Sequence, residues 1–190
     1  ASISTAHGVP TSIPEAFDLY LGTSFDYVVE YLRTNGAFVD RDEVHAAFHT
    51  SLFEDFRTRL QEIPGTCDLL QTLEDNNQLI SIASSGSRER VTLGITTTGV
   101  NQYFKDSIIT TAEDAKRGKP FPDLFLITAE RAGIDPRNCL VIEDSPFGIE
   151  AASHAGMSSI GLAYRTPAEK LSAADLVVRT PKEVLLALGY

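Results

Sequence analysis

The sequence predicts a doubly wound α/β fold preceded by an all-helical module, and a change of pattern along the chain carries this prediction. Residues 1–63 of the 190-residue chain show helical spacing of apolar residues and no convincing strand. From Leu79 onward, short apolar runs alternate with helical patterns. Strands that alternate with helices form parallel sheets covered by helices. We therefore predict a helical module over residues 1–63 and an α/β core over residues 64–190.

Composition narrows the class of protein. The chain is 43% hydrophobic, enough for a sizeable core, and no apolar run approaches the ~18 residues that a membrane helix needs. Its formal net charge of -10 argues against a nucleic-acid-binding surface but allows a local basic pocket for a phosphorylated metabolite. Cys67 and Cys139 lie in no ligand-like cluster, so we expect a pair of buried thiols in a reducing compartment, with a disulfide as the alternative. With no visible signal peptide, we expect a cytoplasmic monomer or homodimer that contacts neither nucleic acid nor membrane.

Capping residues set the predicted helices of the N-terminal module. Ser24 is expected to cap a helix that Asn35-Gly36 ends. Asp40 or Asp42 is expected to cap a longer helix with apolar residues at helical spacing. These apolar residues are Val44, Ala47, Phe48, Leu52, Phe53, Phe56 and Leu60. Residues Cys67–Leu73 are predicted to form the first part of the next helix.

The α/β core is predicted from the alternation of short apolar runs with helical patterns. The predicted strands are Leu79–Ala83, Ser107–Thr110, Cys139–Glu143, Ser158–Ala163 and Leu176–Val178. The predicted helices are Arg88 to about Thr98, Pro122 to about Ala132, Ile149–Met157 and Pro181–Leu188. Pro122 suits a first helical turn and Gly133 suits a helix end.

Two acidic residues, Glu143 and Asp144, end the third predicted strand. Ligands of open α/β sheets bind beyond the carboxyl ends of the strands. Carboxylates at such an end are placed to hold a hard cation such as magnesium. The alternative interpretation is that Asp144 only caps the helix that follows. This stretch alone leaves both interpretations open.

Polar groups also follow the first two predicted strands. Ser84, Ser85 and Gly86 can bind phosphate through a hydroxyl and backbone N–H groups at a helix start, although serine also caps helices. Lys119 precedes Pro120 in a stiff loop after the second strand, where an amine could neutralise phosphoryl charge; a solvated lysine is the common alternative. Serine, lysine and an acid pair on successive strand ends form a constellation typical of phosphoryl transfer.

This set of residues resembles the haloacid dehalogenase superfamily, in particular its β-phosphoglucomutase-like and phosphoglycolate-phosphatase-like branch. The resemblance rests on Ser84, on Lys119 in Gly-Lys-Pro-Phe-Pro-Asp, and on Glu-Asp-Ser-Pro-Phe-Gly-Ile-Glu-Ala-Ala at residues 143–152. It extends over nearly the whole chain, with residues 1–63 resembling a helical cap. It implies a Rossmann-like, doubly wound parallel sheet with that cap inserted after the first core strand.

The resemblance also implies a role for each matching residue. Ser84, helped by the backbone at Ser85, would hold the transferring phosphoryl group. Lys119 would bridge phosphate and nucleophile, and Asp144, with Glu143 beside it, would help to hold Mg²⁺. The implied activity is magnesium-dependent hydrolysis of a small phosphorylated metabolite through an aspartyl-phosphate intermediate.

One part of the family pattern is missing from this sequence. The family's nucleophile is the first aspartate of an Asp-x-Asp motif after the first core strand, and the second aspartate is its general acid/base. The nearest string, Asp18-Leu19-Tyr20, has tyrosine at the second position and no apolar strand before it. We therefore expect the first strand and its nucleophile upstream of this chain, and the chain by itself to be inactive. Natural loss of the strand is the alternative.

Thr23, Ser24 and Phe25 of the cap are candidates for substrate contact. In the mutase group an arginine follows the corresponding Gly-x-Ser and binds a distal phosphate, whereas Phe25 follows here. This difference favours a phosphatase over a sugar phosphomutase, although Phe25 also suits a cap core. A non-catalytic ligand-binding or regulatory relative is the second hypothesis. A receiver-type signalling domain fits less well because its acid pair precedes the Ser/Thr and lysine. The sequence does not identify the substrate.

Overall fold

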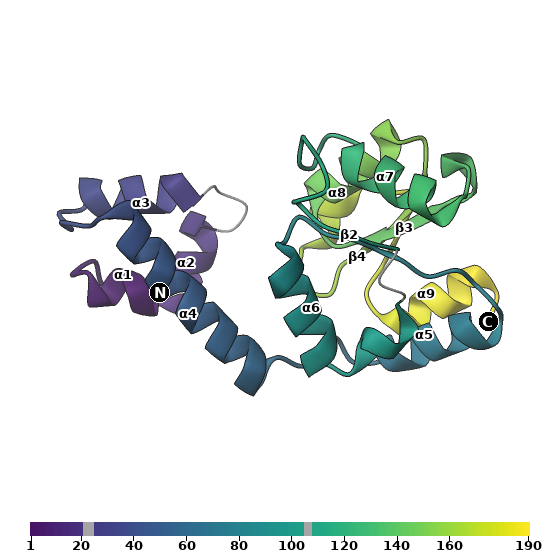
Figure 1. The fold of residues 1–190 in the computed structure, drawn as a ribbon, viewed down its shortest axis with the longest axis horizontal. Helices are drawn as coiled ribbons and strands as arrows, with labels where there is room; N and C mark the ends of the chain where they lie inside the picture. Colours follow the sequence, from purple (N-terminus) through teal and green to yellow (C-terminus); the bar gives the residue numbers. More distant parts are fainter. Residues whose placement is uncertain (21–24, 105–107) are drawn as a thin grey trace. The chain divides into compact units, whose positions relative to one another are not determined.

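The structure, a computed structural model, describes residues 1–20, 25–104 and 108–190. It divides into two compact units, Ala1–Arg59 and Leu60–Tyr190. This division falls shortly before the boundary predicted after residue 63. Figure 1 shows helices alone in the first unit and alternating strands and helices in the second. Among the described residues, no helix is both long and apolar enough to cross a membrane.

Every helix or strand that the structure describes in the first unit is a helix. The helices are α1 (Ser2–Ala6), α2 (Ile13–Tyr20), α3 (Phe25–Thr34) and α4 (Arg41–Arg59). Asp40, rather than Asp42, caps α4, because its carboxylate accepts the backbone N–H groups of Asp42 and Glu43 at 2.9 and 3.1 Å. Val44 of α4 is buried with Leu32 of α3, and Phe53 is also buried, but Ala47 and Phe48 are exposed, so only part of the predicted apolar spacing faces a core.

Strands and helices alternate through the second unit. The strands are β1 (Ile82–Ala83), β2 (Ile109–Thr110), β3 (Leu140–Glu143), β4 (Ser158–Leu162) and β5 (Leu176–Val178). The helices are α5 (Thr66–Asp75), α6 (Arg88–Thr97), α7 (Asp123–Ala132), α8 (Pro146–His154) and α9 (Pro181–Leu188). Short 3₁₀ turns cover Val100–Tyr103, Pro136–Asn138 and Ala168–Leu171.

The described strands pair in parallel and form two sheets, β1-β2 and β3-β4-β5. Helices α7 and α8 cover one face, where Ala129 and Ala151 pack with Val141 of β3. Helices α5 and α9 lie on the opposite face, where Leu69 and Val184 enclose a second apolar cluster. Helices on both faces of parallel strands confirm the predicted doubly wound α/β class.

The ends of several predicted elements differ from the observed ones. The strand predicted over Leu79–Ala83 shrinks to the two-residue β1, because β1 pairs only with β2 among the described strands. Of the strand predicted over Ser107–Thr110, Ser107 lies outside the described residues and Ile109–Thr110 form β2. The helix predicted from Ile149 starts earlier, at Pro146, because Ser145 caps it and proline suits a first helical position. Local pattern thus located the elements, while pairing and capping set their limits.

Strand β3 is paired on one side only in the described structure. Its neighbour is β4, and no described strand pairs with its other edge. Leu140 and Ile142 of β3 are 41% and 37% exposed, whereas Ile160 and Leu162 of β4 are 4% and 9% exposed. Apolar strand residues with this exposure leave an open apolar edge, which parallel sheets rarely present to water.

Two leucines of α7 provide a test of this packing. Leu124 is fully buried and Leu126 is 39% exposed. We expect Leu124→Ala to lower the free energy of unfolding by about 2–5 kcal/mol, because it leaves a cavity in a packed core. Leu126→Ala, the matched control, should cost about 1 kcal/mol or less. Urea denaturation of both variants measures the difference, and equal losses would contradict the packing described for α7.

Candidate active site

An ion pair between Lys119 and Glu143 joins the ends of two strands. The Nζ atom of Lys119 lies 2.7 Å from Oε2 of Glu143 at the end of β3. The same amine donates to the carbonyl oxygen of Ala83, the last residue of β1, at 3.3 Å. The Lys119 and Glu143 side chains are only 10% and 12% exposed. The structure therefore brings the predicted lysine to the carboxyl ends of both β1 and β3.

The second carboxylate oxygen of Glu143 is also engaged. Ser145 donates its hydroxyl to Oε1 of Glu143 at 2.6 Å. The Ser145 oxygen also accepts the backbone N–H of Gly148 at 3.0 Å and so caps α8. Ser145, and not Asp144, is therefore the side-chain cap of this helix. One hydroxyl fixes both the start of α8 and the orientation of Glu143.

Gly148, in the first turn of α8, leaves room for the Glu143 side chain. A Cβ atom at residue 148 would overlap the carboxyl carbon and Cγ of Glu143. Gly148 is buried and has no positive φ angle, so close approach, and not backbone conformation, requires glycine here. The predicted helix started one residue after Gly148, whereas the structure places Gly148 in α8 as part of the wall around Glu143.

Asp144 differs from its neighbour because neither a lysine nor a hydroxyl is bonded to its carboxylate in the described structure. Desolvation by the surrounding protein raises the pKa of Asp144, and the charge of Glu143 raises it further. The residue as a whole is exposed, so a cation can reach it from solvent. A divalent cation would offset the repulsion between the two carboxylates, and oxygen ligands suit Mg²⁺. Asp144 therefore fits a magnesium ligand, although the described residues contain no cluster of three candidate metal ligands.

The turn after β1 presents polar groups at the start of α6. Ser84 accepts the N–H of Gly86 through its hydroxyl oxygen at 3.1 Å, and Ser85 is exposed. Ser87 caps α6 by accepting the N–H of Arg90 at 3.3 Å. Gly86 is buried, and a Cβ atom there would lie 2.7 Å from Nη2 of Arg90. Hydroxyls and N–H groups at a helix start suit an anion, and phosphate binding by this turn stays a prediction.

The cap candidates lie in the first unit. Thr23 and Ser24 fall outside the described residues. Phe25 begins α3 and packs edge-on against the ring of His45, with ring centroids 5.0 Å apart, and at 5.9 Å from the ring of Phe48. These contacts belong to the packing of the first unit, and substrate contact by Phe25 stays a prediction.

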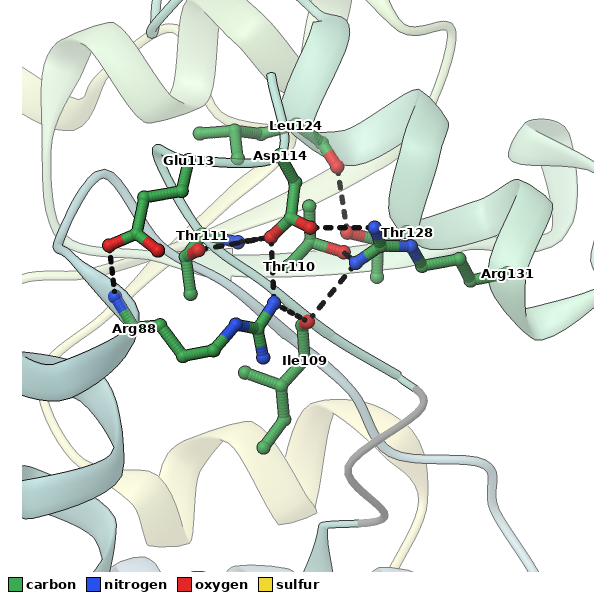
Figure 2. Close-up of polar contacts among 9 residues, drawn as sticks. All are labelled: Arg88, Ile109, Thr110, Thr111, Glu113, Asp114, Leu124, Thr128 and Arg131. Atoms are coloured by element: carbon green, nitrogen blue, oxygen red, sulfur yellow. Dashed lines mark hydrogen bonds and ion pairs between the residues drawn. The ribbon is translucent and has the colours of Figure 1, made fainter.

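A polar cluster around Asp114 was not predicted from the sequence. Arg88 and Arg131 form ion pairs with this carboxylate at 2.9 and 2.6 Å (Figure 2). These partners are 26 and 17 residues away along the chain. No short motif joins residues so far apart, so no local signal could have identified the cluster. Ser145 was visible in the motif, but its bond to Glu143 was not.

The fold and site define a parallel α/β domain with its charged groups gathered at the strand ends, the usual place for ligands in this class. Comparison with known proteins narrows this class. Residues 3–162 match the haloacid dehalogenase-like hydrolase family, and the chain belongs to that family. The motif resemblance and the fold that it implied are thus confirmed.

Individual relatives agree with this family. Validoxylamine A 7'-phosphate phosphatase of Streptomyces hygroscopicus subsp. limoneus is 32% identical over 122 residues, 64% of this chain and 56% of that protein. Phosphoglycolate phosphatase of Escherichia coli (strain K12) is 31% identical over 129 residues, 66% of this chain and 50% of that protein. The match spans only 36% and 31% of two other curated relatives, both from Arabidopsis thaliana.

Solved structures resemble nearly the whole chain. A haloacid dehalogenase family hydrolase from Deinococcus radiodurans R1, solved with bound phosphate and sodium, gives a TM-score of 0.81 at 27% identity and covers 98% of this chain and 84% of that chain. A haloacid dehalogenase-like protein from Agrobacterium tumefaciens gives a TM-score of 0.80 at 26% identity, with 99% and 89% covered. The likeness therefore includes both units of the chain.

Substitution of Gly148 tests the packing around Glu143. We expect Gly148→Ala to lower the free energy of unfolding by about 1–3 kcal/mol, because the new methyl group must displace the Glu143 side chain. Gly118→Ala is the matched control, since a Cβ atom there meets nothing within 4 Å and the φ angle is ordinary. Chemical denaturation gives the two losses. An undisturbed Lys119–Glu143 ion pair in a crystal structure of Gly148→Ala would contradict the argument.

Proposed function

We propose that the intact protein is a magnesium-dependent phosphatase of a small phosphorylated metabolite and works through an aspartyl-phosphate intermediate. The observation that carries this proposal is the buried Lys119 amine, held 2.7 Å from Glu143 beside the end of β1. It places a fixed positive charge between the Ser84 turn and Asp144. The names of the curated relatives, which include several phosphatases of phosphorylated small molecules, support the same chemistry.

Each group of the site has a proposed part in that reaction. Ser84, with the N–H groups of Ser85 and Gly86, binds the phosphoryl oxygens. Lys119 neutralises charge on the transferring group, and Glu143 holds its amine in place. Asp144 is the proposed direct ligand for Mg²⁺, since both oxygens of Glu143 already have partners. Bound Mg²⁺ would supply further positive charge at the phosphoryl oxygens.

The nucleophile is proposed to come from a strand between β1 and β3 of the intact protein. Two features support this position: the separate β1-β2 and β3-β4-β5 sheets, and the exposed apolar residues Leu140 and Ile142 on β3. A parallel strand there would join the two sheets and cover the apolar edge. Its carboxyl end would bring an aspartate close to Lys119. Without that aspartate, residues 1–190 would bind phosphate and metal without turnover.

The state of the two cysteines supports a proposal for the cellular location. Cys67 and Cys139 are both free in the structure and only partly buried. Free thiols persist in reducing compartments, which supports a cytoplasmic location. Desolvation and the nearby Asp135 charge raise the pKa of the Cys139 thiol, so it is mostly protonated at neutral pH.

Asp144→Asn in the full-length protein tests the proposed function. We expect magnesium-dependent hydrolysis of p-nitrophenyl phosphate to fall by at least about 100-fold, because a metal contributes several kcal/mol to stabilising the transition-state charge. Glu150→Gln, which removes an exposed carboxylate from α8, is the matched control and should keep its activity. Unchanged activity in Asp144→Asn would overturn the proposal. A folded wild-type protein that binds phosphate without turnover would support the non-catalytic alternative.

The pH dependence of magnesium binding gives a second test. A raised pKa means that ionised Asp144 reduces the free energy of unfolding at neutral pH, and Mg²⁺ binds this ionised form. The rise in Tm caused by MgCl₂ should therefore be largest at neutral pH and shrink as the pH falls. An ordinary aspartate has a pKa of about 3.9. Because the pKa of Asp144 is raised, we expect the Mg²⁺-induced rise in Tm to begin to shrink at a higher pH than it would for an ordinary aspartate. Differential scanning fluorimetry measures it, with Asp144→Asn showing no shift at any pH.

A further inference from the structure

Asp114 lies at the centre of a polar cluster in the second unit, just beyond β2 (Figure 2). Its Oδ1 atom accepts from Nη2 of Arg131 at 2.6 Å. Its Oδ2 atom accepts from Nη2 of Arg88 at 2.9 Å and from the backbone N–H and hydroxyl of Thr111 at 2.7 and 3.0 Å. The Arg131 and Thr111 hydrogen bonds hold the pKa of Asp114 well below its usual range. The carboxylate is therefore charged at any physiological pH.

The segment around Asp114 is bonded to the turn that follows β1. Ala112 donates its N–H to the carbonyl oxygen of Gly86 at 3.1 Å. Glu113 accepts the backbone N–H of Arg88, the first residue of α6, at 3.0 Å. The Asp114–Arg88 ion pair adds a third link. Residues 112–114 and the start of α6 are thus held together at three successive positions.

The same segment leads to Lys119. Asp114 closes the first turn after β2, because its backbone N–H also donates to the carbonyl oxygen of Thr111 at 3.0 Å. A second ion pair, Arg117 to Asp123 at 2.6 Å, spans the far end of the loop. Lys119 therefore lies between two anchored points. The first of these points is the one that also holds the turn containing Ser84.

Part of the cluster has a purely structural task. Arg88 and Arg131 both donate to the carbonyl oxygen of Ile109, at 3.2 and 3.3 Å. Among the described strands β2 pairs only with β1, so these guanidinium groups satisfy an acceptor on an edge strand. A structural task alone does not require the links from Ala112 and Glu113 to the turn after β1. Those two links connect the segment to the turn that contains Ser84, and so they suggest a role in the site.

We propose that Asp114 is a positioning residue, which holds the Ser84 turn and the Lys119 loop as one unit so that both address the same phosphoryl group. The proposal rests on the proposed phosphatase function. Neutralising the carboxylate breaks this arrangement, because an amide has one acceptor oxygen and cannot serve Arg88, Arg131 and Thr111 together. A misplacement of about 1 Å in a catalytic group can cost roughly 100-fold in rate.

The kinetic test uses the full-length protein and p-nitrophenyl phosphate. We expect Asp114→Asn to lower kcat by roughly 10- to 100-fold and to change KM by less than about 3-fold. Asp135→Asn is the matched control, because Asp135 forms an equally short but more exposed pair with Arg137, at 2.8 Å, away from the site. If Asp114 acts through Lys119, the double variant Asp114→Asn/Lys119→Arg should have a kcat less than about 3-fold below that of Lys119→Arg alone. The proposal would be overturned if the decreases in kcat of the two single variants multiplied in the double variant. It would also be overturned if Asp114→Asn lowered only the stability of the protein and left kcat unchanged.

Amide hydrogen exchange without substrate separates this proposal from the proposed function. Asp114→Asn should speed exchange in both residues 84–88 and residues 111–119, whereas Asp135→Asn should speed neither. Faster exchange in residues 111–119 alone would overturn the coupling. An inactive wild-type protein would overturn the proposed function, while the exchange result would still decide whether Asp114 couples the loops. If Asp114→Asn does not fold, Glu113→Ala removes one exposed link and should speed exchange in residues 84–88.

Discussion

The buried pair of Lys119 and Glu143 is the interaction on which the rest of the site depends. Burying two charges is unfavourable unless each is paired and hydrogen-bonded. Glu143 receives Ser145 as well as Lys119, and the lysine amine also bonds to Ala83 and lies 4.8 Å from the Phe125 ring centroid. These partners offset the cost of removing both charged groups from water. Such a pair is weak evidence for added stability, because desolvation offsets much of its attraction.

Serine caps start the helices that follow the two strands joined by the Lys119–Glu143 pair. Ser87 caps α6 after β1, and Ser145 caps α8 after β3. A capped helix start points backbone N–H groups toward the sheet edge, where an anion gains from them. Ser145 does more than satisfy its helix, because the same hydroxyl orients Glu143. The local chemistry that ends a strand and starts a helix therefore also builds the site.

The charge of the whole chain makes these local groups necessary. A formal net charge of -10 gives a field that does not attract phosphate. Attraction must therefore come from within the site, where charges are partly shielded from water and act more strongly at short range. In the proposed function Lys119 and the start of α6 would supply it directly, and the raised pKa of Asp144 marks a carboxylate for which a cation would be favourable.

The sequence by itself determined the α/β class, the order of the elements and the motif residues at the strand ends. It could do so because periodicity, caps and turn residues are local properties of the chain. Only the tertiary structure decided that Lys119 bonds to Glu143, 24 residues away, that Gly148 makes room for that glutamate, and that Asp114 joins two loops. It also shortened β1, because strand limits depend on pairing. Contacts between distant residues form only when the chain folds, and no local pattern encodes their distances.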